Sequence, residues 1–511
     1  MSWSIETTPG EHQRGSLSGI EDRGVSIRSD LAGSLIASGA ARSNRDRLLA
    51  GEALCVTTGQ QPGLLTGPVM TIHKAVSAVS VAERLTESMR RPVVPVFWVA
   101  GDDHDFDEVN HLHLISPANE VETVRLRARD SGAPAVPMNA EAVGDEIRAV
   151  FDRVSGVTPP TEFRDAMLDL FRQHYAPERS MATSFAHLMA DLLGDLGVVV
   201  FEPYSHEAKR ASVAVMRSAI ERDAEIRSVL LERNERLQSA GKPVPVPVLE
   251  DHTMLMMIGA QGRDRILADG RQLHLRRSGE RFERDELLEF IEDEPWQFSP
   301  NVLLRPIAEA QLLPTVAYIA GPTEAAYWAQ VHPVFELLGT TAPRVLLRWS
   351  GRVVEQRVLK VLAKYDLSMD DLALAEGQLE SRLVRDQLPD DVNDTLRDLR
   401  SAIDKGFRDL VTAATRIEPT LEKPVLGAQN HLYGQLDHIE RKIVTQLKGR
   451  NEVLMRQVSA ARTSLFPLQK PQERVVNVLQ YLIRYGPEYL DGVTQACRAW
   501  AADLESPATV T

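Results

Sequence analysis

"ALCVTTGQQPGLLTGPVMTIHKAVSAVSVAERL", residues 53–85, is followed at residues 91–105 by "RPVVPVFWVAGDDHD". The first stretch has the pattern of a short buried strand, a turn rich in Gly and Pro, and a helix with apolar residues at helical spacing. The second begins as a continuous apolar strand without alternation, which is typical of a parallel sheet covered on both faces. Together they predict a β–α–β unit and therefore an α/β fold.

Further segments extend this sheet and interrupt it. Residues 134–196 carry helical periodicity without a clear strand, and we interpret them as a helical insertion. The apolar run "LGVVVFEP" at 196–203 predicts another strand. Residues 240–295 contain short strands with Gly turns, which indicate a small antiparallel β insertion. "TVAYIAGP" at 315–322 then returns to the core, so the parallel-sheet core is predicted to occupy residues 1–351.

The rest of the chain is predicted to be helical. Apolar residues recur at spacings of three and four over 392–417 and again over 432–465, and the prolines of "EPTLEKP" separate the two runs. This pattern predicts an antiparallel helical coiled-coil hairpin within 352–466. Such a hairpin leaves apolar edges, so we expect it to bury surface against the core or a second subunit. Residues 467–511 contain two more amphipathic helices, which we expect to pack back on the core.

Composition restricts the classes of function. The chain has 511 residues and a formal net charge of −14, and its Arg and Lys stretches are interleaved with acids, so neither nucleic acid nor an anionic membrane is an expected partner. No stretch approaches the roughly 20 apolar residues of a membrane-spanning helix, and the N-terminus lacks the apolar core of a signal peptide. Only Cys55 and Cys497 occur, which excludes a disulfide framework. We therefore expect a cytoplasmic protein.

The turn "TTGQQPGLLTGP" follows the first core strand, where ligands of open parallel sheets bind. Gly59, Gly63 and Gly67 would let the backbone approach a ligand closely, and His73 and Lys74 lie on the following helix. The spacing is neither G-x-G-x-x-G nor a phosphate-binding P-loop motif, so the glycines alone are a weak nucleotide signal. A turn that only packs is the structural alternative.

The second turn, "AGDDHDFDEVNH", permits two kinds of chemistry. As a metal site, His104, His111 and His113 with the neighbouring aspartates supply suitable ligands, although the spacing matches no known zinc motif. As an acid–base and polar-recognition site, the same carboxylates would hold an ammonium or hydroxyls and accept a proton. In the structural alternative the acidic residues only cap the following turn. We favour the polar site because so many ionisable groups at the end of one buried strand exceed what capping needs.

The third turn, "AGPTEAAYW", follows the late strand at 315–322. Arg305, which precedes that strand, has a planar guanidinium that could bind a carboxylate or a phosphate. Glu324 lies at a predicted helix start, where the helix dipole alone favours a carboxylate. Tyr327 is more often a core residue than a ligand contact.

With these turns described, the sequence closely resembles the bacillithiol biosynthesis cysteine-adding enzymes, the BshC family. The resemblance rests on stretches that run in order over nearly the whole chain: "TTGQQPGLLTGPVMTIHKAVSA", "RPVVPVFWVAGDDHDFDEVNHLHL", "SPNVLLRPI", "LLPTVAYIAGPTEAAYWAQVHPVFE" and "PQERVVNVLQYLIRYGPEYLD". It implies a Rossmann-like core similar to class I aminoacyl-tRNA synthetases and other nucleotidyltransferases, and a coiled-coil domain used for homodimerisation. It also implies the addition of L-cysteine to glucosaminyl-malate, the last step of bacillithiol biosynthesis.

A free carboxylate resists attack by an amine, so we expect ATP to activate the cysteine carboxyl as an adenylate or acyl phosphate. We hypothesise that the first turn and His73 occupy the place where related synthetases handle ATP, and we assign no metal. Catalysis is assigned to Asp103, His104 and Asp105, with Asp103 or Asp105 binding the amine or acting as base. Arg305 is assigned to the malyl carboxylates. The other predicted contacts to substrate or nucleotide are Gly59, Gln60, Gln61, Gly63, Gly67, His73, Lys74, Asn110, Gly321, Glu324 and Tyr327.

Two rival functions remain open from the sequence. One is a metal-dependent amidohydrolase built on the Asp/His cluster. The other is a nucleotide-binding scaffold protein without catalysis, which would work through its coiled coil.

Overall fold

The computed structural model describes residues 3–8, 16–21, 26–270, 272–375, 377–385, 390–450 and 452–504. It divides the chain into two compact units. The core unit comprises Ser4–Val353 and Gln472–Thr511, and the helical unit comprises Met1–Trp3 and Val354–Pro471. The C-terminal segment, which we predicted as 467–511, is thus part of the core unit from Gln472 onward.

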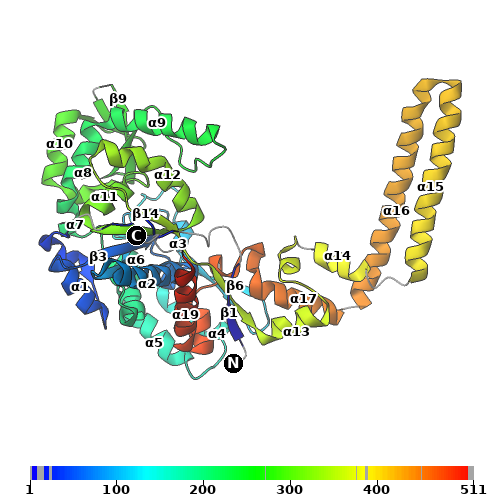
Figure 1. The fold of residues 1–511 in the computed structure, drawn as a ribbon, viewed down its shortest axis with the longest axis horizontal. Helices are drawn as coiled ribbons and strands as arrows, with labels where there is room; N and C mark the ends of the chain where they lie inside the picture. The colour runs from blue at the N-terminus through cyan, green and yellow to red at the C-terminus, as the bar shows by residue number, and fades with distance from the viewer. Residues whose placement is uncertain are drawn as a thin grey trace, which may run out of the picture. The chain divides into compact units, whose positions relative to one another are not determined.

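A six-stranded sheet forms the centre of the core unit (Figure 1). Its strand order is β14-β13-β3-β4-β7-β2. All neighbours are parallel except β2, which runs antiparallel to β7. The strands are β2 (Leu35–Ile36), β3 (Leu54–Gln60), β4 (Val93–Val99), β7 (Val199–Phe201), β13 (Thr315–Ala320) and β14 (Arg344–Leu347). The predicted parallel α/β sheet is confirmed, and β3 lies where the strand order reverses.

Alternating side chains of the apolar strands pack on both faces of this sheet. Phe97 of β4 meets Phe185 of α6 (Met181–Leu193) at a ring-centroid distance of 6.0 Å. Trp98, one residue later, meets Phe201 at 5.1 Å in the cluster formed with α1 (Ala41–Leu49) and α7 (His206–Ala211). Successive residues of a strand point to opposite faces, so an uninterrupted apolar run is needed when both faces are covered.

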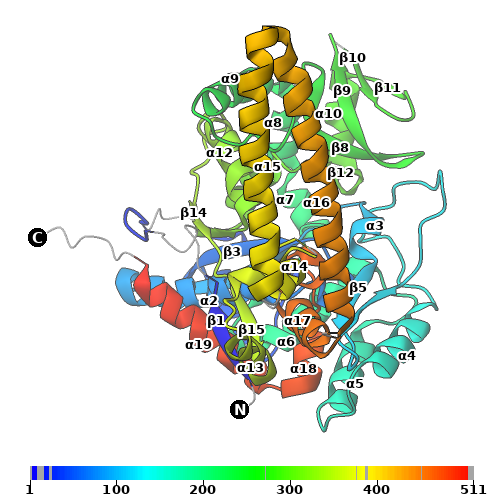
Figure 2. The ribbon, with the colours of Figure 1, turned by 90° about the vertical axis from the view of Figure 1, so that its right-hand side faces the viewer.

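The connection between β3 and β4 is α2 (Met70–Met89), which is buried along most of its length. In Figures 1 and 2, α19 (Glu488–Asp503) lies beside it. The C-terminal segment therefore completes the cover of this face. It also contains α18 (Leu479–Tyr485) and the short turns η8 (Pro467–Gln469) and η9 (Gln472–Arg474) at its start.

The segment between β4 and β7 begins with α3 (Phe106–Val109) and the hairpin β5 (His111–Ile115) and β6 (Val121–Arg125). It continues with α4 (Ile147–Val157), α5 (Arg164–His174), α6 and η4 (Gly194–Leu196). We predicted residues 134–196 as an insertion, yet α6 packs directly on β7. It is the crossover helix that a parallel β4–β7 pair requires, so this part of the segment belongs to the core.

A second segment lies between β7 and β13. Its helices are α7, α8 (Val213–Glu221), α9 (Asp223–Ser239) and α10 (Arg284–Asp293). Its strands form an antiparallel sheet in the order β11-β10-β9-β8-β12, labelled in Figure 2. They are β8 (His252–Gly259), β9 (Gly262–Asp269), β10 (Gln272–Leu275), β11 (Arg281–Glu283) and β12 (Phe298–Pro300). This is the small β insertion expected from the Gly turns, here called the β insertion.

The segment between β7 and β13 also contains η5 (Pro295–Gln297), which lies between α10 and β12, and α11 (Arg305–Leu312), which follows β12. The helix α12 (Pro322–Leu337) then connects β13 to β14. The remaining elements near the N-terminus are β1 (Trp3–Thr7), η2 (Ser29–Ser34) and η3 (Leu64–Thr66). The chain leaves the core unit and enters the helical unit within β15 (Gly351–Glu355).

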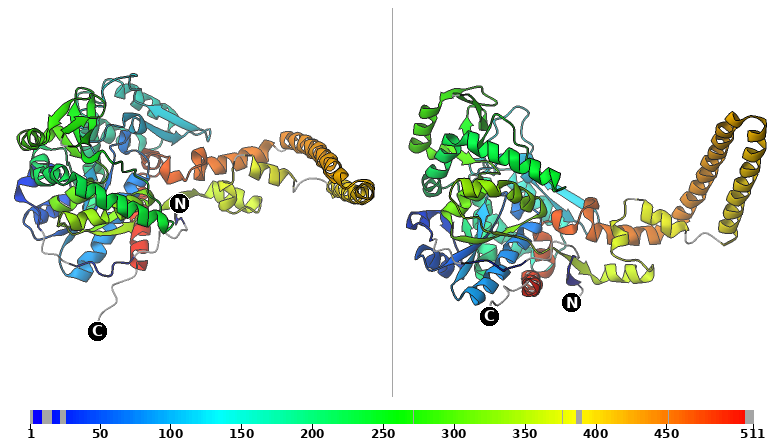
Figure 3. Two further views of the ribbon diagram at one scale, coloured as in Figure 1. Left: turned by 90° about the horizontal axis from the view of Figure 1, so that it is seen from above. Right: turned by 45° about the horizontal axis from the view of Figure 1, so that its top comes forward.

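The helical unit consists of two parts. A small bundle, with its own apolar core, is built from α13 (Gln356–Lys364), η6 (Asp370–Ala373), α14 (Gln378–Arg385) and α17 (Glu452–Leu465). A long hairpin is built from α15 (Asp390–Ile417), η7 (Pro419–Leu421) and α16 (Glu422–Arg450), seen as the paired yellow and orange helices of Figure 3. The described residues of the apolar run predicted over 432–465 lie on α16 and α17.

Contacts across the hairpin fix its antiparallel register. Arg400 of α15 lies 2.7 Å from Asp437 and 2.9 Å from Glu440 of α16. Asp404, one turn further, accepts a hydrogen bond from the hydroxyl of Tyr433.

Among the helices that the structure describes in either unit, none is both long and apolar enough to cross a membrane.

Candidate active site

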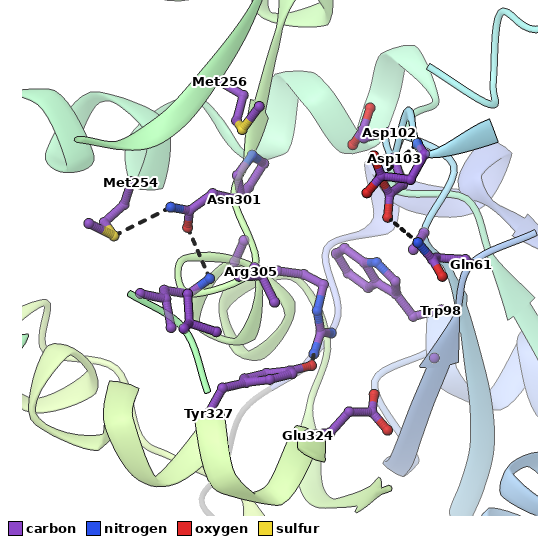
Figure 4. A pocket seen from close by; sticks show the side chains of 18 of the residues that line it. Gln61, Trp98, Asp102, Asp103, Met254, Met256, Asn301, Arg305, Glu324 and Tyr327 are labelled. Carbon is purple, nitrogen blue, oxygen red and sulfur yellow. Dashed lines mark hydrogen bonds between the residues drawn. The ribbon is translucent and has the colours of Figure 1, made fainter. Parts of the chain in front are cut away.

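A cavity of about 770 Å³ opens at the carboxyl ends of β3, β4 and β13. All three predicted turns contribute to its lining, and the β insertion supplies the opposite wall. Figure 4 shows Trp98 and Asp102 on one side, Met254 and Met256 on another, and Tyr327 below them. This is the switch point of the parallel sheet, where loops and helix starts converge around a ligand.

The end of β3 and the start of α12 are joined by a buried ion pair. Lys74 donates to the carbonyl of Gly59 at 2.6 Å and to the side chain of Gln60 at 2.9 Å, and it lies 2.5 Å from Glu324. Burial lowers the pKa of Lys74, although Glu324 opposes this effect. Burial alone would raise the pKa of Glu324, but Lys74 and the N–H of Gly321 hold it below its usual value. The two side chains are therefore held together as a fixed pair.

Arg305, which also lines the cavity, is held by several hydrogen bonds. It donates to Glu309 at 2.6 Å and to the hydroxyls of Tyr318 at 3.3 Å and Tyr327 at 3.0 Å. Tyr318 in turn donates to Glu324 at 2.9 Å, so the two ion pairs are linked. Burial raises the pKa of Tyr327 to about 12. Because its oxygen accepts from Arg305, the hydroxyl proton of Tyr327 is available for a ligand in the cavity.

In the acidic turn after β4, Asp103 is held by hydrogen bonds and the imidazole of His104 is neutral. Asp103 accepts from the side chain of Gln61 at 2.7 Å and from the N–H of His104 at 2.7 Å. Arg263 of β9 lies 3.3 Å from Nδ1 of His104, which fits a neutral ring that accepts from the guanidinium. Burial and the charge of Arg263 lower the pKa of His104. Asp105 is more exposed than Asp103, with 53% of its side chain accessible against 26%.

Two more ion pairs lie at the edge of the cavity. Lys209 of α7, which is buried, donates to Asp102 at 2.7 Å, and burial lowers its pKa. Arg348, just after β14, lies 2.5 Å from Glu473 in the C-terminal segment. Glu473 also lies 2.9 Å from Nδ1 of His73.

Most of the predicted site residues line this cavity. They are Gly59, Gln60, Gln61, Lys74, Asp103, His104, Asp105, Arg305, Gly321, Glu324 and Tyr327. The structure thus brings together residues of the three predicted turns with Arg305 of α11 and Tyr327 of α12.

Gly63, Gly67, His73 and Asn110 are not part of the cavity lining. The turn that holds the two glycines is closed: the N–H of Gly63 donates to Gln61 and that of Gly67 donates to Leu64. The N–H groups are thus committed within the turn, and the glycines form no cradle for phosphate. They are needed because a Cβ on Gly63 would lie 2.8 Å from Cα of Gly67.

His73 and Asn110 have structural partners instead. His73 is 2% exposed and packs edge-on against Trp349 as well as binding Glu473. Asn110 is buried, donates to the carbonyl of Arg127 at 2.7 Å and accepts from Arg125 at 2.7 Å. It fastens the β5–β6 hairpin, so neither side chain is placed to meet a ligand in the cavity.

For the metal-site hypothesis, one group of candidate ligands remains. Within the part of the chain that the structure describes, only Asp103, His104 and Asp105 bring ligand atoms within 4.8 Å of one another. His111 and His113 lie on β5, where their rings contact each other at 5.2 Å. Since Asp103 is already bound by Gln61 and main-chain N–H groups, this is a sparse donor set for a metal.

Several lining residues could not be found from the sequence. They are Trp98 near the end of β4, Lys209 of α7, Met254, Met256, Arg263, Arg265, Arg276 and Arg277 of the β insertion, Asn301 directly after it, and Arg348 after β14. The insertion stretch that contains the arginines reads as an ordinary solvated charged surface. Only its return over the sheet, which no local pattern encodes, brings it to the cavity.

Comparisons with known proteins agree with this architecture. The model of the bacillithiol biosynthesis BshC N-terminal Rossmann-like domain matches residues 28–349, and that of the BshC C-terminal coiled-coil domain matches residues 352–502. A protein of Salinibacter ruber named "Putative cysteine ligase BshC" is 33% identical over 89% of this chain and 83% of its own length. Proteins of the same name from Koribacter versatilis and Heliobacterium modesticaldum are 31% and 30% identical, over 94% and 97% of this chain and 88% and 90% of their own lengths. The chain therefore belongs to the bacillithiol biosynthesis BshC family.

Proposed function

We propose that this chain is a cysteine ligase that joins the carboxyl group of L-cysteine to the amine of glucosaminyl-malate, completing bacillithiol. The observation that carries this proposal is the match of both BshC domain models, together with relatives named as cysteine ligases. The cavity at the switch point offers the chemistry that the reaction needs, because it combines carboxylates, a neutral imidazole and fixed hydroxyls. Neither the amidohydrolase nor the scaffold alternative finds support in these matches.

We further propose that ATP activates the cysteine carboxyl. When bound, ATP would convert the carboxylate oxygen into a leaving group, as phosphate or AMP. The residues that would meet it are those of the cavity rather than the closed turn at Gly63 and Gly67. Cysteine-dependent release of phosphate or pyrophosphate from ATP by the purified chain tests this part separately.

The acidic turn would handle the amine. Asp105 is the carboxylate with spare acceptor capacity, and His104 is neutral and can take the proton that the attacking ammonium must lose. Tyr327 can donate to a substrate oxygen. The turn keeps the first proton, which the ammonium loses to become a nucleophilic amine. Attack of that amine forms the C–N bond and breaks the bond from the carbonyl carbon to the activated oxygen, and the second proton lost by the nitrogen leaves with the phosphate or AMP or passes to solvent.

Thiol profiling of cells that lack the chain tests the function. We expect accumulated glucosaminyl-malate and no bacillithiol, and unchanged bacillithiol would refute the proposal. In the purified chain, His104→Ala and Asp105→Asn should lower cysteine addition at least a hundredfold while the protein stays folded. His332→Ala, at an exposed position on α12, is the matched control and should leave the rate unchanged. Stoichiometric zinc or manganese with hydrolytic activity would instead favour the amidohydrolase.

We also propose a cytoplasmic homodimer that associates through the hairpin of α15 and α16. The hairpin exposes large apolar side chains on both helices, including Leu410 at 49% and Ile439 at 51%. Cell fractionation tests the location, and the mass in solution tests the dimer.

A further inference from the structure

The positive charges of the cavity are of two kinds. Those placed by the sheet and its helices each have a carboxylate of their own: Lys74 with Glu324 at 2.5 Å, Lys209 with Asp102 at 2.7 Å, Arg305 with Glu309 at 2.6 Å and Arg348 with Glu473 at 2.5 Å. These cations are neutralised before any ligand binds. Arg305, which we had assigned to the malyl carboxylates, has both terminal nitrogens of its guanidinium occupied.

The cations of the β insertion differ. Arg265 of β9 and Arg276 and Arg277, directly after β10, line the cavity. Within the described residues, no carboxylate lies within ion-pair distance of any of the three, and all three are exposed. Arg474, at another part of the lining, is likewise exposed. An uncompensated cluster is notable in a chain whose formal net charge is −14.

The same three arginines are held in place through their main chains. Asp264, only 3% exposed, accepts from the N–H of Arg265 at 2.8 Å and from the N–H of Arg277 at 2.6 Å. Arg276 donates its N–H to the carbonyl of Arg265 at 3.0 Å. The carboxylate nearest in sequence is therefore used to align the two strands and not to neutralise a guanidinium. The main chains of the three arginines are thus fixed in place, while their guanidinium groups have no carboxylate partner among the described residues.

We propose that Arg265, Arg276 and Arg277 form the subsite for a multiply charged oxyanion of the small-molecule substrates. This inference rests on the proposed ligase function for the identity of those substrates. Two sources share the chemistry, namely the two carboxylates of the malyl group and the phosphates of a nucleotide, and guanidinium groups bind either through paired hydrogen bonds. Asp103 and Asp105 lie on the turn that meets the β insertion through Arg263 and His104, so a cationic group of the ligand would be held beside the anionic one.

Binding to the purified full chain tests the subsite without requiring turnover. Calorimetric titrations use malate in one arm and inorganic pyrophosphate in the other, each with wild type and with the Arg276→Gln/Arg277→Gln variant. We expect wild type to bind at least one of the two probes, and the variant to bind that probe at least tenfold more weakly and with a smaller dependence on salt. The probe that is affected identifies the source of the anion.

The control is Arg281→Gln, an exposed arginine of β11 in the same small sheet that does not line the cavity, and it should bind both probes as wild type does. Arg265→Gln provides an independent second variant, and equal thermal unfolding temperatures show that the sheet is intact. The subsite is refuted if wild type binds neither probe or if the double variant binds both unchanged. If the subsite holds and the chain adds no cysteine, the proposed function fails alone.

Discussion

Buried charges at the switch point are arranged as fixed pairs. Lys74 and Lys209 are 3% and 2% exposed, and Glu309 is 1% exposed. Removing one member of a buried ion pair leaves an uncompensated charge in a poorly solvated site, which costs far more than removing both members. The main effect of these pairs is therefore structural, because they fix the positions of Glu324, Tyr318 and their neighbours in the cavity.

Arg305→Gln tests this structural role. Glu309 would lose its cation while it still accepts from Thr57, so we expect the free energy of unfolding to fall by about 3 kcal/mol. The double variant Arg305→Gln/Glu309→Gln removes both charges and should be more stable than the single variant. Urea unfolding measures both. A single variant as stable as wild type would contradict the buried pair.

The lowered pKa of His104 predicts a contribution to acid sensitivity. The folded state holds this imidazole neutral, so below about pH 6.5 the unfolded chain binds a proton that the folded chain resists. The stability that neutral His104 contributes is present above that pH and is lost as the pH falls toward the folded pKa. Between pH 7.5 and 5.5, wild type should lose up to about 1 kcal/mol more stability than His104→Gln. Denaturant unfolding at the two pH values measures this difference, and an equal loss in the variant would refute it.

The sequence indicates the site where it follows from chain topology. Gly59, Asp103 and Glu324 end or follow strands of one parallel sheet, and such ends must meet. It does not indicate which cations are free, because pairing depends on side chains far apart in the chain. Arg305 looks available in sequence, yet it is bound by Glu309 one helical turn later. His73 is next to Lys74 but binds Glu473 of the C-terminal segment, a partner that is far away in the chain.

Among elements, the turn between β3 and α2 is the most constrained. Gly67 has φ 68° and ψ −159°, a conformation that residues with a side chain avoid, and Gly63 packs against it. Asn477 of the C-terminal segment donates to the carbonyls of Leu65 and Gly67, each at 2.8 Å. The turn therefore positions Gln60 and Gln61 by its rigidity.

Gly63→Ala should destabilise the protein by about 1–3 kcal/mol, because the new methyl group meets backbone atoms that cannot move aside. Gly156→Ala is the matched control. Gly156 lies in α4, and a Cβ there meets nothing within 4 Å, so alanine should be neutral or stabilising by up to about 1 kcal/mol. Thermal unfolding of both variants measures the contrast. Equal effects would show that the turn is not close-packed.

The long apolar elements are the part of the fold that the sequence predicts well. β3 begins with an apolar run, β4 is apolar throughout, α2 has apolar residues at helical spacing, and α15 has a continuous apolar stripe. β2 has two residues and β14 has four, too few to show a period. The helix α6 shows only helical periodicity, so nothing local distinguishes a crossover helix of the core from an inserted one.

For the whole molecule, the site depends on segments remote in the chain. The β insertion, between β7 and β13, brings arginines to the cavity, and residues after Gln472 return to the core unit to bind Arg348 and the glycine turn. The helical unit is a separate compact body with its own apolar core. Among the hairpin residues whose burial the structure describes, only Ala414 and Leu436 are buried, whereas the large side chain of Leu399 is 46% exposed.

This exposure is what predicts association of two copies. Leu399 and Leu410 of α15 are 11 residues apart, and Leu432 and Ile439 of α16 are 7 apart, so each pair lies on one helix face. Apolar faces of this kind on a two-helix hairpin are stabilised when a second hairpin covers them. We expect wild type to have a mass in solution of twice the 56.7 kDa chain, and Leu410→Glu/Ile439→Glu to have that of one chain with an unchanged helix content. Leu249→Glu, at a residue of the core unit that is 54% exposed, controls for the added charge and should remain dimeric. Sedimentation equilibrium separates these cases, and a monomeric wild type, or a double variant that remains dimeric, would show that the hairpin is not the dimer interface.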